Sequence, residues 1–259
     1  MTINVSTVDF LHQTILFIAS LIANTFSALA GGGAGLLQLP VLIFLGLPFG
    51  VALATHKVAT VALGVGATAR HWREGGIHWR EALFMLVWGL PGVVVGAHVI
   101  LDIPDRIAEM ALGCLTIGLG LYSWLTPSLG QSRVERHRQG GGLWLGGVVL
   151  FILGFLNGSL TSGTGLFVTL WLVRWFGFDY RMAVTYVLVL VGFFWNGAGA
   201  LTLGWLGHIR WDWLPALLLG SLLGGYAGAH LAIVKGNTWI KRGFEAVTIL
   251  VGLKLVFSA

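Results

Sequence analysis

Long apolar runs alternate with short polar breaks along the whole chain. Five runs precede a polar stretch and five follow it, and several reach the ~20 residues that cross the hydrocarbon core of a bilayer. The runs lie at 8–30, 34–46, 50–69, 80–101 and 105–125, and again at 143–160, 164–175, 180–203, 212–234 and 237–257. The pattern predicts an all-α polytopic membrane protein of about ten helices.

Short sequences recur at matching places in the two groups of runs. Residues 30–36 read Ala-Gly-Gly-Gly-Ala-Gly-Leu and residues 160–166 read Leu-Thr-Ser-Gly-Thr-Gly-Leu, and each opens a run that is short for a membrane span. The sequence Gly-x-x-x-Gly-Ala-His occurs at 92–98 and again at 224–230. An internal repeat is the economical interpretation. We expect a first five-helix repeat at 1–125, a basic cytoplasmic linker at 126–141 and a second five-helix repeat at 142–259.

Loop charges predict how the two repeats face. An odd number of helices in a repeat turns the second copy over, and cytoplasmic loops are enriched in Lys and Arg. With the N-terminus outside, the arginines at 70–80 and those of the linker all fall inside. An eight-helix alternative, with 34–46 and 164–175 as re-entrant loops, puts the arginines at 70–80 on the wrong face. We therefore expect inverted repeats with both termini on the outer side.

Composition supports a membrane protein and argues against other classes. The chain is 56% hydrophobic and 10% charged, whereas a soluble domain carries roughly 25% charged residues. The net charge of +5 is explained by loops held near anionic lipid, so we expect the lipid bilayer as a partner and no nucleic acid. Cys114 is the single cysteine, and no metal-ligand spacing, paired carboxylates or nucleophile set occurs within the runs. We expect no cofactor, no metal and no enzyme activity.

The two short runs predict a binding site. At ~1.5 Å per residue, 34–46 and 164–175 are about 20 and 18 Å long, against a hydrocarbon core of ~30 Å. Each is therefore expected to begin inside the membrane, one from each side. Helix N-termini favour anions because they carry free N–H groups and the positive end of the helix dipole. Gly32, Gly33 and Gly163 would let backbone approach a small anion, although tight helix packing also explains these glycines.

Polar side chains within the runs supply further candidates. Lys57 lies about 10 Å from the outer end of its run at ~1.5 Å per residue, and a charge inside a membrane helix usually faces a cavity or a partner. Snorkelling to the interface is the alternative. Thr185 and Tyr186 occupy the matching place in the second half without a charge. The remaining candidates, several of which serve equally well as hydrogen bonds between helices, are Gln38, Thr55, His56, Asn157, Ser162, Thr164 and Asn196.

These motifs together resemble the sulfite exporter TauE/SafE family. The resemblance rests on Gly-Gly-Gly-Ala-Gly at 31–35, Ala-Leu-Ala-Thr-His-Lys at 52–57, Asn-Gly-x-x-x-Ser-Gly-Thr-Gly at 157–165 and Phe-Gly-Phe-Asp at 176–179. It covers nearly the whole chain and implies a permease of the bacterial inner membrane for sulfite, a sulfonate or a related organic anion. Many relatives have Asn where this chain has His56, and many carry a Lys near 187–188, which leaves room for a less charged substrate.

The combined prediction is a secondary transporter that binds a small anion where the two short helices begin. Alternating access would come from one repeat rocking against the other. An anion channel or facilitator of the same fold is the alternative function. The glycine-spaced faces at 92–98 and 224–230 are expected to serve contacts within one chain, with a homodimer as the alternative. No carboxylate is expected deep in a run, so no proton relay is predicted.

Overall fold

The computed structural model describes residues 5–71, 77–99, 105–159, 163–206 and 209–257, and these form helices joined by short connections. The elements are α1 (Val5–Ala30), α2 (Ala34–Phe44), α3 (Phe49–His71), α4 (Trp79–His98), α5 (Asp105–Leu125), α6 (Gly140–Ser159), α7 (Thr164–Arg174), α8 (Tyr180–Tyr186), the π-helix η1 (Val187–Trp195), α9 (Asn196–Leu206), the 3-10 helix η2 (Trp211–Trp213), α10 (Leu214–Lys235) and α11 (Asn237–Phe257). Because α8, η1 and α9 are continuous, the described residues form about ten helical segments, as the sequence predicts.

Helix length and hydropathy identify a multi-pass membrane protein. Six helical stretches of the described residues are long and apolar enough to cross a bilayer: Phe10–Ala30, Phe49–His71, Trp79–His98, Gly140–Ser159, Tyr180–Trp205 and Trp211–Lys235. Large apolar side chains such as Phe44 and Trp205 are about nine-tenths exposed, which suits contact with lipid rather than water. The predicted short helices are confirmed, since α2 and α7 have 11 residues each.

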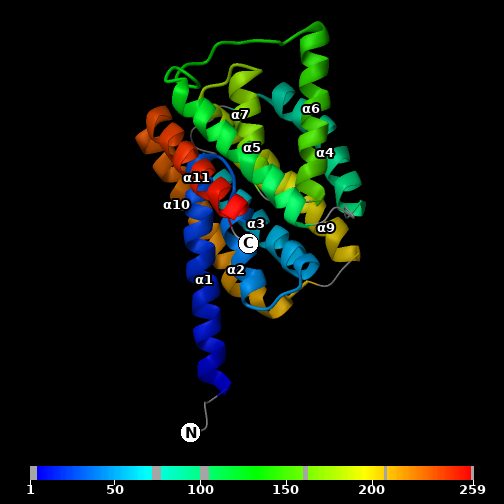
Figure 1. The fold of residues 1–259 in the computed structure, drawn as a ribbon, viewed down its shortest axis with the longest axis vertical. Helices are drawn as coiled ribbons and strands as arrows, with labels where there is room; N and C mark the ends of the chain where they lie inside the picture. Colours follow the sequence, from blue (N-terminus) through cyan, green and yellow to red (C-terminus); the bar gives the residue numbers. More distant parts are fainter. Residues whose placement is uncertain (1–4, 72–76, 100–104, 160–162, 207–208, 258–259) are drawn as a thin grey trace.

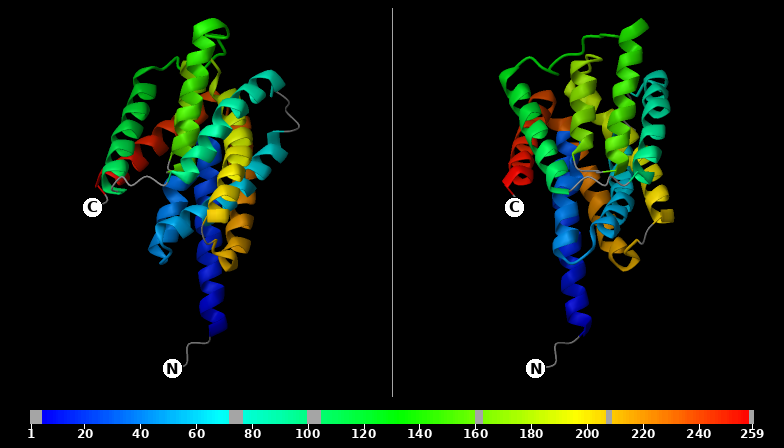
Figure 2. Two further views of the ribbon diagram at one scale, coloured as in Figure 1. Left: turned by 90° about the vertical axis from the view of Figure 1, so that its right-hand side faces the viewer. Right: turned by 45° about the vertical axis from the view of Figure 1, so that its right-hand side comes forward.

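Helices α1 and α6 run in opposite directions. In Figure 1, α1 rises from the N-terminus at the bottom, whereas α6 begins at the top, where the linker after α5 joins it. Helix α1 packs along α10, and α6 packs along α4. Figure 2 also shows α1 extending beyond the rest of the bundle at its N-terminal end.

Glycines allow both of these helix pairs to pack with their backbones in contact. A Cβ on Gly92 or Gly96 would lie 2.2 or 2.1 Å from a carbonyl oxygen of α6. A Cβ on Gly224 or Gly228 would lie 2.6 or 2.3 Å from a carbonyl oxygen of α1. The glycine-spaced faces therefore serve contacts within one chain, which is the first of the two roles expected for them.

The third helix of each half crosses the other near the centre of the bundle. Helix α3 contacts η1 where a Cβ on Gly64 would lie 2.5 Å from the amide nitrogen of Phe193. The sequence predicts a regular helix over 180–203, but Val187–Trp195 is a π-helix of 9 residues. Because every residue of that stretch other than Gly192 is a large apolar one, its hydrophobic pattern contains no periodicity that could distinguish a π-helix from an α-helix.

Candidate functional site

Each short helix begins after a glycine in the left-handed region. Gly33 precedes α2 with φ 94°, Gly163 precedes α7 with φ 73°, and neither helix start has a side-chain capping hydrogen bond. Left-handed backbone is accessible to glycine at little cost, whereas other residues adopt it with strain. The glycines therefore set the direction of each short helix and leave its first N–H groups without a side-chain cap.

The two helix starts meet, and their contacts are reciprocal. A Cβ on Gly33 would lie 3.1 Å from Cδ1 of Leu166, and a Cβ on Gly163 would lie 3.1 Å from Cδ1 of Leu36. Between them, a Cβ on Gly32 would lie 2.6 Å from Cα of Gly165. Only glycine at position 32 allows the two backbones to approach this closely. The glycine sequences near 31–35 and 163–165 thus lie in contact with each other.

A small cavity lies beside this contact. Its volume is about 40 Å³, and because one water needs roughly 10–15 Å³ by this measure, it has room for a small group of atoms. The polar lining comes from side chains on five different helices, beside the glycines of the helix starts: Ser27, His56, Thr60, Asn157, Thr164 and Asn196. Residues of η1 close the remaining wall.

Lys57 reaches this region through Asn157. Its side chain is fully buried, and its Nζ donates hydrogen bonds to the backbone oxygen of Asn157 at 2.7 Å and to Oδ1 at 3.1 Å. Asn157 in turn donates from Nδ2 to Oγ1 of Thr164, the first residue of α7, at 2.9 Å. The burial excludes the snorkelling alternative, and among the described residues Lys57 has no carboxylate partner. Its charge is therefore balanced by carbonyl dipoles alone, which favours an anion nearby.

A glycine on α9 makes room for Lys57. A Cβ on Gly199 would lie 2.9 Å from Cδ and 3.1 Å from both Cε and Nζ of that lysine. Lys57 belongs to the first half of the chain and Gly199 to the second, so the two halves together hold the lysine side chain in place.

His56 is held by a network of buried polar side chains. Its Nδ1 lies 2.8 Å from Oε1 of Gln38, and Nε2 of Gln38 donates to Oγ of Ser20 at 3.0 Å. Ser20 also contacts Oγ of Ser221 at 2.9 Å, and Asn24 donates to that same Ser221 oxygen at 3.0 Å. Gln38 thus supports His56 from behind the cavity. The i, i+4 spacing of Ser20 and Asn24 within an apolar run is the signal that could have located the network.

Among the described residues, three of the candidate side chains neither line the central cavity nor form a hydrogen bond with a side chain that does. Oγ1 of Thr55 accepts a hydrogen bond from the backbone N–H of Arg210, and Oγ1 of Thr185 donates to the backbone oxygen of Arg181. Tyr186 donates from its hydroxyl to Glu81. Ser162 lies outside the described residues. The structure therefore gathers Gly32, Gly33, His56, Asn157, Thr164 and Asn196 at the cavity, with Lys57, Gln38 and Gly163 directly behind them.

Sequence reasoning missed Glu81, which lies near the start of α4. This carboxylate contacts two arginines of the linker and the hydroxyl of Tyr186. Its position two residues after the start of the helix offered no signal of a buried partner, because helix starts commonly carry an acidic residue.

Comparisons with known proteins identify the family of the chain. The family model described as sulfite exporter TauE/SafE matches residues 16–255. A probable membrane transporter protein of Haemophilus influenzae is 30% identical over 245 residues, which covers 94% of each chain. Two further probable membrane transporter proteins are ORF9 of Sinorhizobium sp, 28% identical over 93% of this chain and 91% of that one, and YfcA of Escherichia coli, 27% identical over 95% and 90%. No solved structure matches.

The family match spans nearly the whole sequence, and both short helices with their glycine starts fall inside it. The relative from Haemophilus influenzae matches along almost its full length as well. The chain is a multi-pass membrane protein of a transporter family, and it belongs to the sulfite exporter TauE/SafE family.

Proposed function

We propose that this chain is a secondary transporter that carries a small anion, either sulfite, a sulfonate or a related organic anion, by alternating access. The observation that carries the proposal is the position of Lys57, buried and tied through Asn157 to the start of α7. That start meets the start of α2 beside a polar cavity. A buried ammonium group and two uncapped helix N-termini all lower the cost of holding a negative charge at one point.

The size of the central cavity supports a carrier more than an open channel. A volume of about 40 Å³ suits a substrate enclosed within the protein, and movement of the walls must then open it to each side in turn. One wall is the π-helix η1, an element that is rare and frequently found at functional sites. Transport leaves the substrate chemically unchanged, so the proposal includes no catalytic residue.

We also propose that the two halves are inverted repeats. The support is the pairing of α1 with α10 and of α6 with α4 through glycines, together with the reciprocal contacts at the two helix starts. Such halves can exchange conformations by rocking, which opens a central site first to one side and then to the other. Loop charges support a location in the bacterial inner membrane with both termini outside.

The decisive experiment measures uptake of radiolabelled sulfite into proteoliposomes preloaded with unlabelled sulfite or methanesulfonate. We expect saturable uptake that the internal anion accelerates, and a fall to the level of empty liposomes for Lys57→Met, which removes the charge but keeps the length. Lys235→Met is the matched control, because Lys235 is exposed and contacts Trp239. Flux that survives in Lys57→Met would contradict the role of this lysine, and an ohmic current without counterflow would establish the channel alternative.

Membrane potential gives a second readout of the same proposal. An inside-negative potential is worth about 2.3 kcal/mol per elementary charge per 100 mV, which favours the exit of an anion. We expect an imposed potential to accelerate efflux in proportion to the charge of the anion. Efflux that ignores the potential would exclude transport driven by the anion's own charge.

A further inference from the structure

A second cavity, part charged and part apolar, lies where the linker after α5 crosses the end of the bundle. It has a volume of about 820 Å³, far larger than the central cavity and within the ~300–1,000 Å³ typical of ligand pockets. One side carries charged side chains of the linker and of the start of α4. The other side is apolar and includes Phe84, Met85, Leu172, Phe176 and Phe178.

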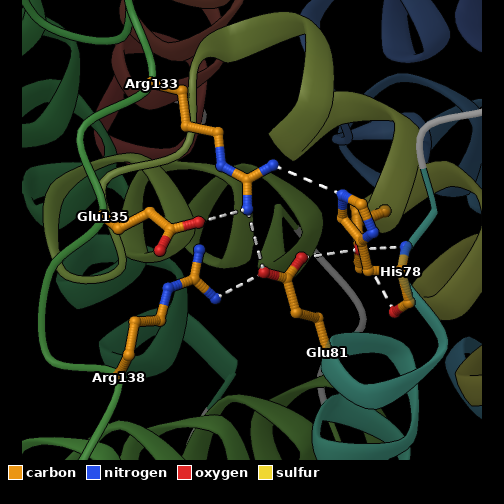
Figure 3. Close-up of polar contacts among 6 residues, drawn as sticks. His78, Glu81, Arg133, Glu135 and Arg138 are labelled. Carbon is orange, nitrogen blue, oxygen red and sulfur yellow. Dashed lines mark hydrogen bonds and ion pairs between the residues drawn. The ribbon is translucent and has the colours of Figure 1, made fainter.

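Glu81 lies at the charged side of this cavity as an internal counterion. Its Oε1 accepts from Nη1 of Arg138 at 2.7 Å and from Nη2 of Arg133 at 3.2 Å, as Figure 3 shows. Its Oε2 accepts from the hydroxyl of Tyr186 at 2.7 Å. The side chain of Glu81 is 17% exposed, so these interactions occur largely out of water and are stronger than exposed ion pairs.

Glu81 does not use all the hydrogen-bond donors of the two arginines. Nε and Nη2 of Arg138 and Nε of Arg133 are buried without a hydrogen-bond acceptor among the described residues. Glu135 also pairs with Arg133 at 2.8 Å, but its side chain is 62% exposed and offers a weaker counter-charge. Buried guanidinium N–H groups without acceptors are costly, so this part of the cavity is suited to a further anion.

The position of Arg138 is fixed by an aromatic ring. Its guanidinium carbon lies 4.8 Å from the centroid of the Phe178 ring, a cation–π arrangement that holds the plane of the group. Phe178 also lines the apolar side of the cavity. The charged and apolar parts of the cavity therefore adjoin at this pair, as recognition of an amphipathic anion requires.

We propose that this cavity is a second binding site, which takes an organic anion with an apolar chain. A sulfonate or carboxylate head would bind the free N–H groups of Arg133 and Arg138 and displace the Glu81 carboxylate from the others. The chain would lie against the apolar side of the cavity, at Phe84, Phe176 and Phe178. The site rests on the proposed function in one respect, namely that its ligand belongs to the transported class of anions. Sulfite alone would leave most of the 820 Å³ unfilled, so the site favours organic over inorganic anions.

Binding at the second site would affect the central cavity through Tyr186. This residue immediately precedes η1, whose first residue, Val187, lines the central cavity. When an anion displaces Glu81, the hydroxyl of Tyr186 loses its carboxylate acceptor at the start of the π-helix. Occupancy of the second site thus changes the contacts of the element that closes the first.

The test measures binding of hexanesulfonate and of methanesulfonate to the purified full chain in detergent by isothermal titration calorimetry. We expect hexanesulfonate to bind at least about tenfold more tightly than methanesulfonate, and Arg138→Gln to weaken hexanesulfonate at least about tenfold. Arg136→Gln is the matched control, since Arg136 is an exposed arginine of the same linker outside this cavity. Affinity that depends neither on chain length nor on Arg138 overturns the site.

The variant Glu81→Gln tests whether Glu81, Arg133 and Arg138 serve ligand binding or only hold the fold together. Removing the internal counterion frees the arginines, so we expect hexanesulfonate to bind several-fold more tightly, an outcome that damage to the fold cannot produce. Weaker binding in Glu81→Gln, with an unchanged unfolding temperature, contradicts the displacement. The result is independent of the central site, because Lys57→Met should abolish flux and leave hexanesulfonate affinity unchanged.

An anionic lipid presents the same chemistry as a free organic anion. Titrations in nanodiscs with and without anionic lipid therefore complete the experiment. We expect similar hexanesulfonate affinity in both. Competition by the anionic lipid that disappears in Arg138→Gln would assign the cavity to a lipid headgroup and overturn a free organic anion as its ligand.

Discussion

The third helices of the two halves border the same cavity and contribute different properties to it. Helix α3 is a regular α-helix that supplies His56 and the buried charge of Lys57. The helix that α3 crosses is α8, η1 and α9 in succession, which supplies Asn196 and a π-helical wall but no charged side chain at the cavity. One half therefore supplies the electrostatic attraction, and the other supplies an irregular backbone that can change its hydrogen bonding.

A methyl group added to α3 at its contact with η1 should destabilise the protein more than one added to η1. A Cβ on Gly64 would lie 2.5–2.8 Å from backbone atoms of η1, whereas a Cβ on Gly192 would meet Leu63 Cδ2 at 3.2 Å and Gly64 Cα at 3.3 Å. We expect Gly64→Ala to lower the free energy of unfolding by about 3 kcal/mol and Gly192→Ala by less than about 1 kcal/mol. Thermal unfolding in detergent measures both. Equal losses would mean that η1 is as rigid as α3.

The position of the Lys57 charge should depend on the opposite half of the chain. Gly199→Ala places a methyl group against the lysine side chain, so we expect sulfite flux to fall about twentyfold while the protein stays folded. Gly197→Ala is the control, because a Cβ there meets only Val61 at 4.0 Å. If Gly199→Ala transports normally, the lysine does not need its present position.

Replacing each of the two asparagines of the cavity should weaken the affinity for sulfite to a different degree. Asn157→Ala removes an acceptor of Lys57 and the link to Thr164, and a hydrogen bond to a charged group is worth roughly 1.5–3 kcal/mol. We expect the apparent affinity for sulfite to weaken about tenfold. Asn196→Ala should weaken it by about threefold or less, because Oδ1 of Asn196 has no partner among the described residues. Concentration dependence of counterflow gives both values, and the reverse order would place the substrate beside α9.

The smallest effect is expected at Thr185. Its hydroxyl bonds the backbone of Arg181 and contacts His71 rather than the central cavity. Thr185→Val should therefore change the apparent affinity for sulfite by less than about twofold in the same assay. A larger change would mean that the substrate contacts α8 during part of the transport cycle, as the sequence alone had suggested.

Much of the fold follows from the sequence because hydrophobic length and glycine placement act locally. The ten segments, the two short helices and the meeting of their starts depend on features that a run of about twenty residues contains. Polar partners could not be predicted in this way. Glu81 pairs with two arginines of the linker, Arg133 and Arg138. Ser20 contacts Ser221 at a separation of 201 residues. No local pattern specifies such pairs.

The packing of α1 on α10 has a consequence for synthesis of the chain. Ser20 donates its hydrogen bond to the backbone oxygen of Leu217, 197 residues later. At roughly 5–20 residues per second, the ribosome needs about 10 to 40 s to make that distance. For that time the polar face of the first helix lies in or beside the membrane without its final partner. During the interval α1 depends on the insertion machinery or on temporary contacts, and the arrival of α10 then supplies the final partner of Ser20.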